Sequence, residues 1–201
     1  MSDRMIIRNG IVLTLNDADD VHFGGTVVID GDRITTVAGD SEDVQVDPGR
    51  AIDATGKIVM PGLIDLHYHT ALGKGWSDHL PLWEYLQTCW YPMIRALDPE
   101  SAYWAALASY AESIRCGVTT INDMYRQLDA LGDAAEKIGI RATLSNDVAT
   151  DEHDLDTLAD NAAAFHSKHG AAGGRIEVRV GIEWLPLASE ELLRDARALA
   201  N

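Results

Sequence analysis

The stretch VMPGLIDLHYHT, residues 59–70, decides how the rest of the chain is interpreted. A Pro-Gly pair precedes a short apolar run, and the run ends in His67 and His69 with one tyrosine between them. Side chains at positions i and i+2 of a strand point the same way, so we expect two neighbouring imidazoles and Tyr68 on the opposite face. Such a pair suits zinc or iron, although histidines at a strand end also occur as ordinary hydrogen-bonded polar residues.

From residue 59 onward, strand and helix patterns alternate four times. Strands alternating with helices predict a parallel sheet, either a small doubly wound sheet or half of an eight-stranded barrel. In both folds the active site lies at the carboxyl ends of the strands. The expected strands are 62–69, 118–124, 140–147 and 175–183, and the expected helices lie within 80–97, 98–117, 128–138, 155–165 and 189–201.

Apolar periodicity also predicts which helix faces are buried. The second helix should bury Tyr103, Leu107, Tyr110 and Ile114, with Asp98 as its N-cap. The next two helices are expected to bury corresponding stripes: Leu128, Leu131, Ala135 and Ile138 in one, and Leu155, Leu158, Ala162 and Phe165 in the other.

Residues 1–58 have a different sequence pattern, in which short β-rich runs are separated by turns. Asp30-Gly31-Asp32 joins two such runs and predicts a hairpin. A further strand pair is expected around Thr55-Gly56. We therefore divide the chain into a β portion, residues 1–58, and a βα portion, residues 59–201.

The composition excludes several classes of protein. A net charge of −16 disfavours binding to nucleic acid or anionic membranes, and no apolar run reaches the ~18 residues of a membrane helix. Two cysteines without a C-x-x-C motif favour a cytoplasmic protein. Arg outnumbers Lys by 12 to 4 and Asp outnumbers Glu by 22 to 10, which fits either a salt-loving source or an ordinary acidic protein.

The segments GKIVMPGLIDLHYH and RCGVTTINDMY closely resemble the amidohydrolase superfamily, in the branch of deaminases and triazine chlorohydrolases. The resemblance implies an α/β fold: the N-terminal part of a small β-sandwich, then the first four βα units of a TIM-like (β/α)8 barrel. It also implies that His67 and His69 hold one divalent metal ion, zinc or iron. The fourth predicted strand lacks the lysine that bridges two metals elsewhere in the superfamily, which favours the one-metal branch.

The implied reaction is hydrolysis of a non-peptide carbon–nitrogen bond, such as deamination of a heterocyclic amidine by a metal-activated water. Glu183 stands where similar sequences have a histidine facing the substrate, so the substrate is left open. Each candidate substrate contact also has a structural alternative, as a helix cap, a solvated loop residue or a wall of the core. These candidates are Glu183, Trp184, His79, Asp123 and Asn146, with Asp147 beside the last of them.

The resemblance places the general acid/base and the remaining metal ligands after residue 201. The chain alone is therefore expected to be weakly active or inactive as a hydrolase of a small heterocyclic substrate. Two other readings stay open: a non-catalytic remnant or half-barrel that needs a homo-oligomeric or complementary partner, and a metal-binding module without turnover. An open half-barrel is also expected to expose sheet edges and an apolar interior.

Overall fold

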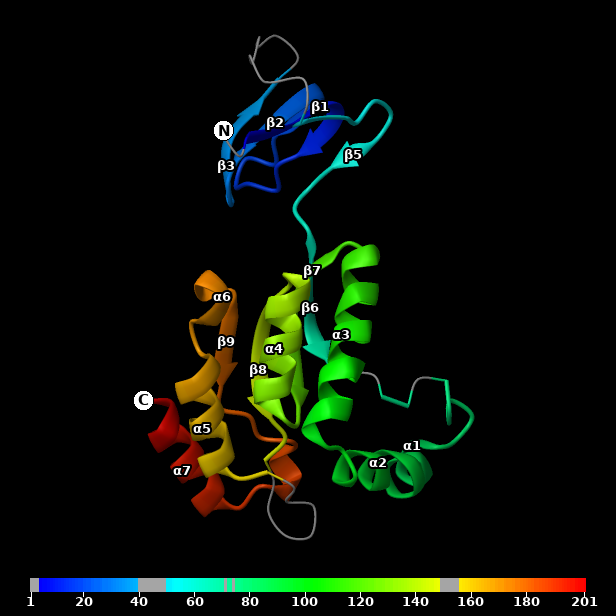
Figure 1. Ribbon diagram of the computed structural model, residues 1–201, viewed down its shortest axis with the longest axis vertical. Helices are drawn as coiled ribbons and strands as arrows, with labels where there is room; N and C mark the ends of the chain where they lie inside the picture. Colours follow the sequence, from blue (N-terminus) through cyan, green and yellow to red (C-terminus); the bar gives the residue numbers. More distant parts are fainter. Residues whose placement is uncertain (1–3, 40–49, 71, 74, 149–155) are drawn as a thin grey trace. The chain divides into compact units, whose positions relative to one another are not determined.

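The computed structural model describes residues 4–39, 50–70, 72–73, 75–148 and 156–201 (Figure 1). Its contacts divide the chain into two units, Met1–Pro61 and Gly62–Asn201. Among the described residues, no helix is both long and apolar enough to cross a membrane.

In its described residues, the first unit forms a five-stranded sheet with the order β3-β2-β1-β4, and β5 also pairs with β1. The predicted hairpin is confirmed, because Asp30 pairs with Arg33 across a turn in which Gly31 has a φ of +61°. The second predicted strand pair is wrong, since β4 and β5 each pair in parallel with β1 instead of with each other. The strands are β1 (Arg4–Leu13), β2 (Val21–Asp30), β3 (Arg33–Ala38), β4 (Ala51–Asp53) and β5 (Ile58–Val59).

The second unit contains a parallel sheet whose strands follow one another in the order β6-β7-β8-β9. A doubly wound sheet reverses its strand order at a switch point, and this sheet does not, so the order is that of a barrel. The strands are β6 (Leu63–Tyr68), β7 (Val118–Tyr125), β8 (Arg141–Asn146) and β9 (Ile176–Arg179). The main helices are α3 (Pro99–Arg115), α4 (Leu128–Ile138), α5 (Leu158–Lys168) and α7 (Glu190–Ala200), with the short α6 (Ala171–Gly174) and η4 (Leu185–Leu187) between them.

The predicted helical insertion after β6 consists of three consecutive helical segments at the carboxyl end of the sheet (Figure 1). They are α1 (Leu82–Tyr85), a π-helical segment (Leu86–Trp90) and α2 (Tyr91–Arg95). Pro92 has no N–H to donate to the preceding turn, which suits a widened segment just before it. Such π-helical turns occur frequently at functional sites. We call residues 82–95 the insertion helix.

Helix α3 begins as expected, because the Asp98 carboxylate accepts a 2.7 Å hydrogen bond from the Ser101 N–H. Its buried face differs from the prediction. Tyr110 is fully buried, but Tyr103 and Leu107 are only half-buried and Ile114 is exposed. The buried face consists mostly of small residues, which let α3 approach its neighbours closely: Ala102, Ala105, Ala106, Ser109, Tyr110 and Ser113.

Helix α4 buries Leu128, Leu131 and Ala135 as predicted, and Ile138 packs against the core. Helix α5 instead buries Asn161 and Ala164 and leaves Phe165 exposed. Helix α5 turns Asn161 toward the sheet because the Asn161 amide donates hydrogen bonds to the Asn146 side chain and to the Arg179 carbonyl. Leu155, placed in the same predicted stripe, lies outside the described residues.

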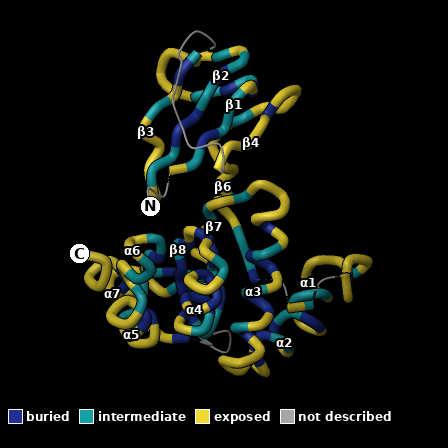
Figure 2. Tube along the Cα trace, turned by 45° about the horizontal axis from the view of Figure 1, so that its top comes forward, coloured by how far each residue is buried: buried dark blue, intermediate teal, exposed yellow. Residues whose placement is uncertain are grey.

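The two faces of the parallel sheet differ in chemistry. Helices α3, α4 and α5 cover one face (Figure 1). The strands contribute Ile121, Leu144 and Ile176 to this face, all at 0% exposure, and Figure 2 shows buried segments around β8 and α4. Alternation along the strands puts the intervening side chains on the other face. These are chiefly polar: Thr120, Asn122, Thr143, Ser145, Glu177 and Arg179.

The expectation of an exposed apolar interior holds only at the edge of this face. Ile64 pairs with Thr120, shares the open face with it and is 62% exposed, whereas the other strands present chiefly polar side chains there. Leu63 and Leu66, also on the edge strand β6, are 52% and 76% exposed.

We expect Ala106→Leu to destabilise the chain and Ala108→Leu to be nearly neutral. Both alanines lie on α3, but Ala106 is fully buried and Ala108 is exposed. Extra methylenes forced into a packed core cost about 1–3 kcal/mol. Urea unfolding of the two variants measures the difference, and equal stabilities would contradict the packing of α3.

Candidate functional site

The two histidines at the end of β6 lie side by side, as predicted. Their ring centroids are 4.9 Å apart and the rings are nearly perpendicular, at 84°. His69 Nδ1 lies 2.8 Å from the Met124 carbonyl oxygen. A carbonyl only accepts hydrogen bonds, so Nδ1 carries the hydrogen and Nε2 keeps its lone pair. This is the arrangement in which metal-binding histidines are usually held.

The backbone just after His69 is anchored by a buried carboxylate. Asp123, at 0% exposure, accepts hydrogen bonds from the Thr70 N–H at 3.1 Å, the Thr70 hydroxyl at 2.6 Å and the Tyr110 hydroxyl at 2.7 Å. Burial raises the pKa of Asp123 to about 6, although these hydrogen bonds lower it. Since the folded-state pKa is raised, ionisation costs folding free energy as the pH rises from about 4 to about 6.

Asp123 and Asn146 were expected as substrate contacts, and the structure places both on the helix-covered face. Asp123 shares that face with Ile121 and is fully engaged by Thr70 and Tyr110. The Asn146 amide donates to Asp156 at 2.9 Å, and its oxygen accepts from α5. This placement favours structural roles. The sequence does carry a signal for this placement. Asp123 is two residues from the buried Ile121 and Asn146 is two residues from the buried Leu144, so strand alternation puts each pair on the same face.

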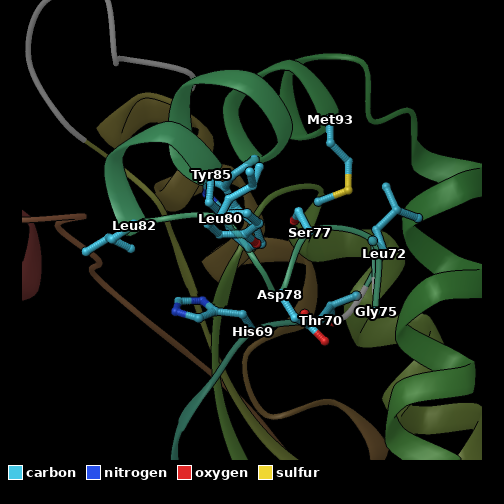
Figure 3. A pocket seen from close by; sticks show the side chains of 12 residues that line it. His69, Thr70, Leu72, Gly75, Ser77, Asp78, Leu80, Leu82, Tyr85 and Met93 are labelled. Carbon is cyan, nitrogen blue, oxygen red and sulfur yellow. The ribbon is translucent and has the colours of Figure 1, made fainter.

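A cavity of about 560 Å³ adjoins His69. His69 and Thr70 lie on its floor side, while the loop after β6 and the insertion helix supply the other walls (Figure 3). The lining includes Leu72, Ser77, Asp78, Leu80, Leu82, Tyr85, Trp90 and Met93. His79, expected as a pocket residue, is exposed and outside this lining, although both its neighbours belong to it.

The insertion helix contacts residues that follow both edge strands of the parallel sheet, β6 and β9. The Trp90 ring lies 5.7 Å from the His69 ring and 5.6 Å from the Tyr125 ring. The next residue, Tyr91, donates its hydroxyl to Glu183 Oε1 at 3.2 Å. Trp83 contacts Trp184 at 5.8 Å. The predicted residues after β9 are therefore brought under the same helix that reaches His69.

Two carboxylates, Asp147 after β8 and Glu183 after β9, lie close enough to influence each other electrostatically. Burial raises the pKa of Asp147 to about 7, and the negative charges of Glu183 and Asp156 add to this effect. The pKa of Tyr91 rises to about 12, first through burial and then through the Glu183 charge and its hydrogen bond. Thr70 and Tyr110 also contribute to the site without having been expected there. Thr70 ends the VMPGLIDLHYHT stretch and Tyr110 was expected only as a core residue, and no local pattern indicates that both bond Asp123.

A sequence profile of the amidohydrolase family matches residues 58–201. The chain belongs to the amidohydrolase family. What it contains corresponds to the N-terminal half of that fold.

Curated relatives include several deaminases of adenosine derivatives. A 5-methylthioadenosine/S-adenosylhomocysteine deaminase of Thermoanaerobacter pseudethanolicus is 32% identical, with 98% of this chain and 46% of the relative covered. A 5'-deoxyadenosine deaminase of Methanobrevibacter smithii is 36% identical, with 100% and 47% covered. The chain thus spans about half the length of the curated relatives it matches.

Solved structures of amidohydrolase enzymes share the fold. An adenosine deaminase from Xanthomonas campestris with bound zinc superposes with a TM-score of 0.86 at 21% identity, covering 98% of this chain and 46% of that one. An atrazine chlorohydrolase from Arthrobacter aurescens in complex with zinc gives 0.78 at 22% identity, covering 98% and 50%. The α/β architecture with the first four βα units of a barrel is confirmed.

The histidine pair fits part of a metal shell. Within the described ranges, no group of three or more histidine, cysteine, aspartate or glutamate side chains is arranged to hold a metal ion. A catalytic zinc ion takes three protein ligands and a structural one takes four. Two neighbouring imidazoles, one with its tautomer fixed by Met124, match two of those positions.

We expect Tyr110→Phe to lower the free energy of unfolding by about 1.5–3 kcal/mol at pH 8, the cost of a lost hydrogen bond to a charged group. The loss should shrink at pH 5, where Asp123 is protonated and needs the donor less. Tyr103→Phe, on the same helix but half-buried, is the control. Urea titrations at both pH values test this, and a pH-independent loss would show that Tyr110 does not act through Asp123.

Proposed function

We propose that this chain supplies the first metal ligands and part of the substrate site of a hydrolase that deaminates an amino-substituted heterocycle. The observation that carries the proposal is the His69 imidazole, whose Nδ1 is fixed on the Met124 carbonyl beside His67. The relatives named as deaminases of adenosine derivatives support a carbon–nitrogen bond as the target.

His67 and His69 would hold one divalent ion, for which zinc is favoured by the zinc in similar structures. When bound, such an ion lowers the pKa of a water molecule and makes it a nucleophile. The protein's own contributions are positional. Asp123 fixes the chain after His69 through Thr70, and the Trp90 ring covers one side of the imidazole.

The cavity beside His69 suits a flat ring. Its walls include the aromatic side chains of Tyr85 and Trp90 and the apolar side chains of Leu82 and Met93. Ligand sites are mostly apolar with a few placed polar groups. We assign the recognition of ring or exocyclic nitrogen to Glu183, with Trp184 beside it, because a carboxylate accepts N–H donors where the histidine of similar sequences offers an imidazole.

The second reading, a half-barrel that needs further strands, is favoured by β6. Leu63, Ile64 and Leu66 are each more than half exposed on this edge strand, and an exposed apolar edge invites pairing with another strand. We propose that β6 is covered by additional strands of the same fold, from a second copy or a complementary chain.

We also propose a reducing, cytoplasmic setting for the chain. Both cysteines are free thiols, Cys89 buried and Cys116 exposed, which fits that environment. The charge of −16 fits either a salt-rich or an ordinary cytoplasm, and comparing stability at low and high salt separates the two.

We expect His67→Ala and His69→Ala to weaken zinc binding by at least roughly tenfold, because each removes one of two neighbouring ligands. His79→Ala is the matched control, since His79 is exposed on the following loop. Equilibrium dialysis of the full chain with metal analysis gives the zinc affinity. Zinc binding that survives both substitutions would refute the metal assignment.

Ammonia release from adenosine, 5'-deoxyadenosine and methylthioadenosine separates an enzyme from a metal-binding unit. We expect any zinc-dependent release to vanish in His69→Ala and to rise when strands that cover β6 are supplied. Release that continues without zinc would contradict the proposed chemistry. Zinc binding without release from any substrate would favour the half-barrel reading.

A further inference from the structure

Three strand ends meet beneath the insertion helix, and each brings an oxygen-bearing side chain. Tyr125 ends β7, Asp147 follows β8, and Glu183 follows β9. The ends of β8 and β9 approach so closely that a Cβ on Gly181 would overlap the Asn146 carbonyl. The Glu183 N–H also donates to the Val148 carbonyl at 2.8 Å. The backbone itself therefore brings the two carboxylates together.

Asp147 has an unusual environment for an acidic side chain. It is 6% exposed, and its Oδ1 is buried without a hydrogen-bond partner among the described residues. A buried acceptor left without a donor typically costs about 1–3 kcal/mol. The Tyr125 hydroxyl, in a residue 1% exposed, is likewise buried without a partner in the described part of the chain. Asp123, in contrast, is fully engaged, so buried carboxylates here are not generally left unsatisfied.

Among the described residues, the charges that act on Asp147 are predominantly negative. They are the carboxylates of Glu183 and Asp156 and the guanidinium of Arg126. Arg126 forms a 2.9 Å ion pair with Asp156. On the insertion helix, Arg95 lies over the Tyr91 ring, 5.6 Å from its centroid, and the Tyr91 hydroxyl donates to Glu183.

We propose that Asp147 and Glu183 form a subsite that binds a positively charged nitrogen group of the substrate: an ammonium, an amidinium or a guanidinium. This rests on the proposed function, because it assigns the subsite to the substrate of the same hydrolase. A cation with N–H donors satisfies the buried Asp147 oxygen and offsets the excess negative charge. Tyr91 and Tyr125 border this group: Tyr91 donates to Glu183, and the Tyr125 hydroxyl has no partner among the described residues.

The subsite specifies the nitrogen assigned to Glu183 more closely. It would be a basic, charged nitrogen group of the substrate that reaches the ends of β8 and β9, apart from the carbon that a metal-activated water would attack. Because the pKa of Asp147 is raised to about 7, this carboxylate is mostly protonated at pH 6 and mostly ionised at pH 8. Cation binding should therefore strengthen as the pH rises through 7.

Benzamidine, a flat cation, and benzamide, its neutral counterpart, test the subsite on the full chain. By calorimetry at pH 8, benzamidine should bind at least about tenfold more tightly than benzamide. At pH 6 its affinity should fall by about tenfold, since only about a tenth of Asp147 would be ionised. Asp147→Asn and Glu183→Gln should each weaken benzamidine binding by about tenfold or more, and Asp147→Asn should also remove the pH dependence. Glu136 is exposed on α4, so Glu136→Gln should change neither the benzamidine affinity nor its pH dependence.

Equal binding of the two probes, binding of neither, or full benzamidine affinity in Asp147→Asn would overturn the proposal. Asp147→Asn should keep the fold and raise the thermal midpoint at pH 8, because it removes a buried charge, so loss of binding is not loss of structure. His69→Ala separates the two proposals. If the His69→Ala variant loses zinc but still binds benzamidine, both the metal site and the cation subsite are supported. If the native chain binds zinc but not benzamidine, the cation subsite alone is overturned.

Discussion

The geometry of this half-barrel depends on one buried carboxylate. Asp123 accepts three hydrogen bonds, two from Thr70 and one from Tyr110, at full burial. It thereby ties the end of the edge strand β6 to the carboxyl-terminal part of β7 and to α3. A carboxylate this deep is costly to ionise, and the three donors offset that cost. Without the tie, the histidine that precedes Thr70 would sit at the loose end of an edge strand.

Much of this fold follows from the sequence, because the signals involved are local. The strand ending in His67 and His69, the hairpin at Gly31 and the cap at Asp98 each depend on neighbours a few residues apart, and all three are confirmed. The resemblance to a known family then settles the choice between a barrel and a doubly wound sheet.

What the sequence could not reveal depends on contacts between distant segments. The buried face of α3 is made of alanines and serines, which periodicity of large apolar residues overlooks. Asp123 and Asn146 lie near strand ends, as substrate contacts do, but the alternation of side chains along their strands turns them toward the helices. The link from Tyr91 to Glu183 joins residues 92 positions apart, and no local pattern indicates it.

The polar, uncovered face of the parallel sheet has a consequence for how such a protein is made. Each strand of β6-β7-β8-β9 pairs with the next one along the chain, and the side left open carries Thr120, Asn122 and Thr143 rather than a large apolar surface. A ribosome releases the N-terminal strands first. These units can therefore pack against their helices as they emerge, while β6 and the most recently made strand of the row present open edges that are vulnerable to aggregation.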